Sequence, residues 1–182
     1  VNLGLDRTLG ENWRATFNAY AWYDAAYTLR HNEVRGFTDE VLDEHEDDFD
    51  LQDAYIEGKL GKNWDIRIGR QVVVWGFSDN LRVLDFLNPL DNLEPGLADI
   101  EDLRRPVGMV KLDHFIRTQG NPWRLSLIAI PEQRFSRNPA FGSDFYAVTD
   151  AQGNAVKFGE ESPDDFEDIN TAISLKGQIA GF

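Results

Sequence analysis

The stretch WRATFNAYAWYDAAYTL, residues 13–29, alternates between apolar and polar side chains and indicates the fold class. Its odd positions, from Trp13 to Leu29, are apolar and carry no charge, whereas its even positions include Arg14 and Asp24. Side chains point alternately to the two faces of a β-strand, so this period of two predicts a strand with one apolar and one polar face. Seventeen residues are long for a soluble strand, which usually has about five or six. The length suits a tilted strand that crosses a bilayer.

The same alternation recurs in six further segments. We predict strands over residues 1–5, 51–60, 64–75, 107–118, 123–130 and 169–182, and therefore seven strands in all. Charged residues keep to the polar positions of these strands, and Arg70 is the exception. A β-bulge at Gly69 would return Arg70 to the polar face, because a bulge inserts one residue and glycine tolerates the geometry.

Short and long connections alternate along the chain. Residues 6–12, 61–63 and 119–122 are predicted turns, and residues 31–50, 76–106 and 131–168 are predicted long loops. This is typical of an up-and-down barrel with one short rim and one elaborated rim. A tryptophan follows each turn (Trp13, Trp64 and Trp123). Three such rings at one height predict an aromatic girdle at the lipid headgroups, whereas in a soluble sheet they would be core residues.

These patterns predict an all-β fold, an antiparallel up-and-down transmembrane β-barrel with long extracellular loops that carry short helices and with short periplasmic turns. Residues 1–182 would supply about seven strands of a single outer-membrane barrel domain truncated at both ends, since bacterial barrels usually have an even number of strands. No apolar run approaches the roughly 20 residues of a membrane-spanning helix. A soluble β-sandwich is the alternative fold.

The chain is acidic, with a net charge of −14, and it contains no cysteine. An acidic chain repels phosphate, which argues against a nucleic-acid partner. The acid is concentrated in the long loops; residues 31–50 hold nine acidic residues against Arg35. Such a run is either a solvated surface or a rim that binds divalent cations bridging lipopolysaccharide. The spacing around His45 lacks the glycine of an EF-hand loop, so no metal site is predicted.

The polar faces of the predicted strands carry both acidic and basic residues. Opposed charges that line a water-filled bore sort solutes, and an open bore would favour small anionic or zwitterionic solutes. In a plugged bore the same residues would pair with each other. The predicted pore-lining residues are Arg14, Asp24, Asp53, Glu57, Lys59, Asp65, Arg67, Lys111, Asp113, Arg117 and Arg124.

The loop over residues 76–106 is more apolar than the other two. Ser78-Asp79-Asn80 predicts the start of a short helix that ends at Asn88-Pro89, and residues 97–103 form a second helical candidate. Such a loop either lies as a lid on the rim or folds into the bore. If it folds inward, it would bring these residues to a constriction: Asp79, Arg82, Asp85, Asp99, Arg104 and Arg105.

Several motifs resemble a known family. They are IGRQVVVWG at residues 68–76, SDNLRV at 78–83, NPLD at 88–91, DIEDLR at 99–104 and IAIPE at 128–132. Together they are similar to a proteobacterial outer-membrane porin-like β-barrel family catalogued as a domain of unknown function, family 1302. The resemblance covers roughly residues 50–150. It implies a larger outer-membrane barrel, of which this chain is a fragment, and it implies no substrate, cofactor or catalytic residue.

The sequence therefore predicts a channel or transport protein of the cell outer membrane for a small solute, with outer-membrane lipid and lipopolysaccharide as its surroundings. A non-conducting structural barrel, or one that binds a partner or lipopolysaccharide, is the alternative. An enzyme is not expected, because His31, His45 and His114 are scattered and no catalytic motif occurs. No cofactor is predicted either.

Overall fold

The structure is a computed structural model, which describes residues 1–30, 38–74, 87–96, 103–117, 122–150, 152–154, 156 and 169–177. The strands in these ranges are β1 (Asn2–Leu9), β2 (Trp13–Tyr23), β3 (Asp47–Leu60), β4 (Trp64–Gln71), β5 (Val107–Arg117), β6 (Pro122–Ile130) and β7 (Asn170–Gly177). Two short helices, α1 (Ala25–Arg30) and α2 (Asp39–His45), lie between β2 and β3. None of the helices in these ranges is both long enough and apolar enough to span a bilayer.

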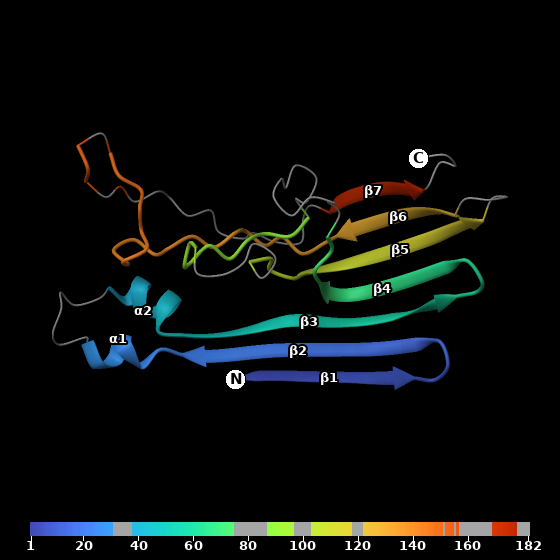
Figure 1. Cartoon of the computed structure of the whole chain (residues 1–182), viewed down its shortest axis with the longest axis horizontal. Helices are drawn as coiled ribbons and strands as arrows, with labels where there is room; N and C mark the ends of the chain where they lie inside the picture. The colour runs from blue at the N-terminus through green and yellow to red at the C-terminus, as the bar shows by residue number, and fades with distance from the viewer. Residues whose placement is uncertain are drawn as a thin grey trace.

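The strands form one antiparallel sheet in the order of the chain, from β1 to β7. This confirms the predicted all-β class and the seven consecutive antiparallel strands. The turns after β1 and β3 lie at one end of the sheet, and α1 and α2 lie at the other (Figure 1). The sheet is open, with β1 and β7 at its edges. Closure into a barrel stays a prediction.

The predicted strand over residues 13–29 is wrong in its second part, because β2 ends at Tyr23 and α1 begins at Ala25. Asp24 separates the two elements. Its Oδ1 accepts a hydrogen bond of 2.8 Å from the backbone amide of Ala26, which satisfies a donor that the first turn of a helix leaves free. Alanine also has the highest helix propensity, so a period of two did not suffice to predict a strand here.

Strand β3 begins at Asp47, within the segment predicted to be a loop. Its register against β2 shifts between the pairs Phe17–Ala54 and Ala19–Leu51, where β3 contains one residue more than β2. Such a β-bulge exchanges the two faces of the strand. Asp50 therefore lies on the same face as Glu57, although simple alternation would assign them to opposite faces.

The predicted bulge at Gly69 is wrong, because the pairing of β4 with both neighbours is continuous through this residue. Gly69 instead has φ 128°, a conformation that side-chain-bearing residues rarely adopt, and a Cβ there would overlap the backbone of Ala54. The guanidinium of Arg70 nonetheless forms ion pairs with Asp50 and Glu132. The side chain of Arg70 thus reaches the polar face without an inserted residue, next to a glycine with an unusual backbone conformation.

The two faces of the sheet differ in character. The outer face carries exposed apolar side chains, among them Phe17, Ile68, Val110, Leu127 and Ile173. The inner face carries the charged residues near the short turns. Near its other end the inner face of β5 and β6 is apolar and buried, in a core of Val73, Leu87, Val107, Met109, Ile128 and Ile130.

Candidate functional site

The charged residues of the inner face lie in two rows that cross the strands. In the first row, Arg14, Glu57, Arg67 and Lys111 are direct cross-strand neighbours on β2, β3, β4 and β5. The second row, nearer the turns, holds Lys59, Asp65 and Asp113. Side chains that face each other across antiparallel strands are about 5 Å apart at Cβ. The register therefore gathers seven of the predicted pore-lining residues.

Four of these charges pair within the rows. Nε and Nη2 of Arg67 donate to Oε2 of Glu57 at 3.0 and 2.6 Å, and the guanidinium lies 4.4 Å from the ring centroid of Tyr55. Nζ of Lys111 donates to Asp113 at 2.7 Å. The same carboxylate accepts a hydrogen bond from Oγ of Ser126 at 2.5 Å. Glu57 and Asp113 are thus already neutralised by protein groups.

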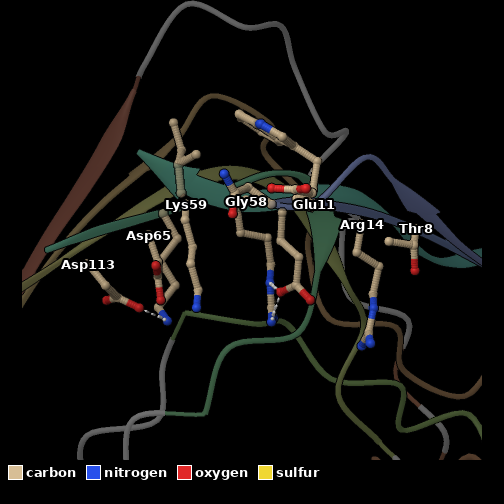
Figure 2. Close-up of a pocket in the computed structure, with 13 residues that line it drawn as sticks. Thr8, Glu11, Arg14, Gly58, Lys59, Asp65 and Asp113 are labelled. Carbon is tan, nitrogen blue, oxygen red and sulfur yellow. Dashed lines mark hydrogen bonds and ion pairs between the residues drawn. The ribbon is translucent and has the colours of Figure 1, made fainter. Parts of the chain in front are cut away.

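The other three charges, Arg14, Lys59 and Asp65, line a hollow of about 430 Å³ on the inner face. Within the described ranges none of the three forms an ion pair, although Lys59 and Asp65 are direct cross-strand partners. Figure 2 shows Arg14, Lys59, Asp65 and Asp113 extending from the same side of the sheet. The hollow is therefore charged and open, and only some of its charged side chains form ion pairs with other residues that line it.

Thr8 and Glu11 also line the hollow and were missed by the sequence analysis. Both residues were predicted to lie in a turn over residues 6–12. Because β1 extends to Leu9, Thr8 belongs to the strand, and Glu11 follows it. The same extension puts Arg7 on the outer face, opposite Ala15. Alternation around Leu3, Leu5 and Leu9 was the signal that could have extended the strand.

Four predicted pore-lining residues do not line the hollow. Asp24 lies outside the strands, at the start of α1, so its prediction as a lumen residue is wrong. Asp53 lies beside the register shift of β3. Arg117 and Arg124 belong to the pairs Arg117–Pro122 and Phe115–Arg124 near the turn end of β5 and β6.

Of the predicted constriction residues, Asp79, Arg82, Asp85 and Asp99 lie outside the described residues. The described part of this loop, residues 87–96, packs on the inner face, because Leu87 belongs to the core there. Asn88 fixes the segment with three hydrogen bonds: it accepts from the Val73 amide at 2.9 Å and donates to the carbonyls of Gln71 and Arg105 at 3.2 and 3.0 Å. Leu87 and Asn88 thus hold the start of residues 87–96 against the sheet, and whether the loop forms a constriction stays a prediction.

Arg105 belongs to an acid–base cluster that joins this loop to β3 and to the segment after β6. Nη2 of Arg134 lies 3.2 Å from Oδ1 of Asp50, and Arg105 lies 3.9 Å from its Oδ2. Arg137 donates to Asp48 at 2.8 Å and to Asp91 at 2.7 Å. Arg104 forms a backbone bridge with Leu90. The members of the cluster are Asp48, Asp50, Arg70, Asp91, Arg105, Glu132, Arg134 and Arg137.

Electrostatics differ between two arginines of the acid–base cluster. Burial, together with the positive charges of Arg134 and Arg137, lowers the pKa of Arg105. Burial would also lower the pKa of Arg137, but the carboxylates of Asp91 and Asp48 outweigh it and raise that pKa. Asp48 and Asp50 were predicted to lie in the acidic loop over residues 31–50, whereas β3 begins at Asp47.

The three tryptophans that open β2, β4 and β6 lie on the outer face at the turn end. The register sets Trp13 opposite Gly58 and Trp123 opposite Gly177, and in both pairs a Cβ on the glycine would overlap the indole ring. Trp64 stacks on His114 with ring centroids 4.1 Å apart. The indoles of Trp13 and Trp123 thus each cover a glycine of the neighbouring strand, whereas that of Trp64 covers an imidazole.

No catalytic arrangement emerges among the histidines that the structure describes. His114 stacks on Trp64, and His45 is buried between Tyr27 and Phe145. His31 lies outside the described residues. No group of three potential metal ligands occurs in the described ranges.

Comparisons with known proteins gave one finding. No curated protein and no solved structure matched the chain. A family model described as "Protein of unknown function (DUF1302)" matches residues 1–176. This match covers nearly the whole chain, and the chain therefore belongs to the DUF1302 family.

Proposed function

We propose that this sheet is part of an outer-membrane β-barrel that acts as a channel for small polar solutes. The observation that carries the proposal is the outer face, whose strand residues are mostly apolar, although Arg7 near the turn is charged. Large apolar side chains remain exposed on it from one edge of the sheet to the other, for example Leu5 at 61%, Ile68 at 48% and Ile173 at 71%. Soluble monomers rarely expose apolar patches beyond a few hundred Å². Lipid is the partner that matches such a face.

The tryptophan positions support strands that are tilted in a membrane. The strand pairing leads from Trp13 across β3 to Ile66 on β4, two residues beyond Trp64. It leads from Trp64 across β5 to Leu125 on β6, two residues beyond Trp123. A step of two residues over two strands corresponds to an angle of about 35°. Strands of membrane barrels tilt by about 35–45°. At this tilt the three indoles lie at one height, as a girdle requires.

The height of the apolar band supports the same proposal. Tyr23 follows Trp13 by ten residues on β2, which is about 33 Å along the strand. A tilt of about 35° reduces this to a vertical height of about 27 Å, close to the roughly 25 Å of an outer-membrane apolar band. Tyr23 and Phe49, both on the outer face, are 59% and 71% exposed at the far end. They would form the second aromatic girdle.

The inner face supports a water-filled lumen. Its rows of charged side chains and its hollow favour contact with water. Residues 87–96, folded into the bore, would form a constriction. A closed barrel needs further strands that pair with the free edges of β1 and β7, because an open edge is not tolerated in hydrocarbon. The solute-selective residues would be those of the two rows.

The channel proposal is tested with the full-length protein in planar bilayers. We expect voltage-driven conductance and a requirement for detergent during purification. The variant Ile68→Lys places a charge on the lipid face and should lose membrane insertion, since a lysine in mid-bilayer costs about 2–4 kcal/mol. Thr8→Lys adds the same charge on the inner face and should insert normally. A protein that stays soluble without detergent, or that tolerates both variants equally, would overturn the membrane assignment.

A non-conducting barrel that binds a partner or lipopolysaccharide is the second candidate. The acid–base cluster favours it, because it ties the inward-folded segment to the wall through ion pairs of 2.7 to 3.9 Å. A barrel that inserts normally but does not conduct at any voltage would favour this candidate over the channel.

A further inference from the structure

We propose that the hollow between β2 and β5 binds the carboxylate of small organic monoanions and gives the channel its solute preference. This inference names the substrate class of the proposed channel and rests on that function for its physiological meaning. The binding step itself can be measured without conductance.

Several charged side chains that line the hollow form ion pairs or hydrogen bonds with each other. Glu57 is taken by Arg67, and Asp113 by Lys111 and Ser126. This leaves two cations, Arg14 and Lys59, and two anions, Asp65 and Glu11. The preference for an anion therefore rests on where the charges lie, because Arg14 and Lys59 are neighbours on β2 and β3.

The positions of the two cations suit a single carboxylate. Arg14 is the cross-strand partner of Glu57, and Lys59 follows Glu57 by two residues on the same face of β3. Such diagonal neighbours are about 7–8 Å apart at Cα, within reach of one ligand between long side chains. A guanidinium binds a carboxylate through two parallel hydrogen bonds, and an ammonium adds a point charge. The hydroxyl of Thr8, opposite Arg14, supplies a further donor.

The acidic residues that line the hollow indicate which ligands would bind poorly. Asp65 faces Lys59 without an ion pair, and Glu11 lines the hollow from the turn. A second carboxylate on the ligand would meet one of these charges, and like charges at close range repel. The hollow, at about 430 Å³, accommodates a molecule of a few to about ten heavy atoms. Small monocarboxylates meet both conditions.

The test combines binding and permeation of the full-length protein. Saturation-transfer NMR in detergent measures binding of acetate, with succinate as the dianion and choline as the cation. Reversal potentials in a potassium acetate gradient measure selectivity. The variant Arg14→Gln/Lys59→Gln should bind acetate about tenfold or more weakly, since it loses both charged hydrogen-bond donors. Its acetate permeability relative to potassium should fall.

The matched control removes two positive charges elsewhere on the same hairpins. Arg7 lies on the outer face of β1 and Lys62 in the turn after β3, both exposed. Arg7→Gln/Lys62→Gln should bind acetate as the parent protein does. Equal loss in both double variants, unchanged binding in the first, or tighter binding of choline than of acetate would overturn the inference. Acetate binding that depends on Arg14 and Lys59 in a protein that does not conduct would uphold the site and refute the channel.

Discussion

Replacing Asn88 by leucine tests whether this side chain holds residues 87–96 against the end of β4 and the segment before β5. Asn88 is 4% exposed and makes three hydrogen bonds to backbone groups. Leucine has a similar size but can form none of them. The amide of Val73, which is 6% exposed, would lose the acceptor that Asn88 provides.

The magnitude follows from these contacts. An unsatisfied buried donor costs about 1–3 kcal/mol, and each of the two other hydrogen bonds contributes about 1 kcal/mol. Asn88→Leu should therefore lower the local opening free energy by about 3–5 kcal/mol. This corresponds to a loss of roughly 10²–10⁴-fold in hydrogen-exchange protection. In a conducting barrel the same variant should increase the conductance, because the constriction is released.

Hydrogen exchange in detergent, read by mass spectrometry, measures this effect in peptides that cover residues 71–74 and 87–96. Asn92→Leu is the matched control, because only its backbone amide forms a hydrogen bond, to the carbonyl of Arg137. Strand amides in β2 should keep their protection in both variants. If Val73 exchanges equally slowly in the Asn88→Leu variant, Asn88 does not hold the loop.

Three further perturbations have defined outcomes. Gly58→Val should push the Trp13 indole off β3, which a red shift of tryptophan emission and a loss of about 1–3 kcal/mol of stability would report. Asp50→Asn should destabilise the protein by about 3 kcal/mol, because it leaves the buried guanidinium of Arg134 without its counter-charge; chemical denaturation measures this. Burial lowers the pKa of His45 below its ordinary value of 6.5, so the packing of α2 should be fully stable above about pH 6.5 and weaken as the pH falls below it, as limited proteolysis would show.

Each of these outcomes has its own control. Gly4→Ala should be mild, because its Cβ meets only the flexible side chain of Asn18. Asp47→Asn removes an exposed charge and should leave stability unchanged. His45→Phe keeps the aromatic packing and should abolish the pH dependence. The reasoning would be contradicted if a control lost as much stability as its variant. It would also be contradicted if proteolysis still increased at low pH in the variant without His45.

Much of the fold could be predicted because a strand records its two faces in its own sequence. The turns at Gly61–Asn63 and the strands β4, β5 and β6 agree with their predicted positions to within a few residues, apart from the end of β4. Prediction failed where the local signal was ambiguous. The apolar odd positions continue through Ala25 and Tyr27, yet Asp24 starts a helix there, because a capping hydrogen bond competes with strand pairing.

The candidate site was predictable in part for the same reason. Seven of the eleven predicted pore-lining residues meet at the hollow, since their strands keep an uninterrupted period of two. Asp48 and Asp50 could not be assigned, because the extra residue of β3 reverses its faces and only pairing with β2 shows where it lies. Arg134 and Arg137 come from a segment without periodicity, and their partners on β3, Asp50 and Asp48, lie more than 80 residues away in the chain.

The sequence by itself determined which side chains share a face, because successive residues of a strand point in opposite directions whatever surrounds them. It thereby determined the apolar outer face and the charged rows. Only the tertiary structure decided which charges neutralise each other and which stay open, since ion pairing depends on the register between strands. The placement of Asn88 was decided there too, because it depends on backbone partners on two other segments.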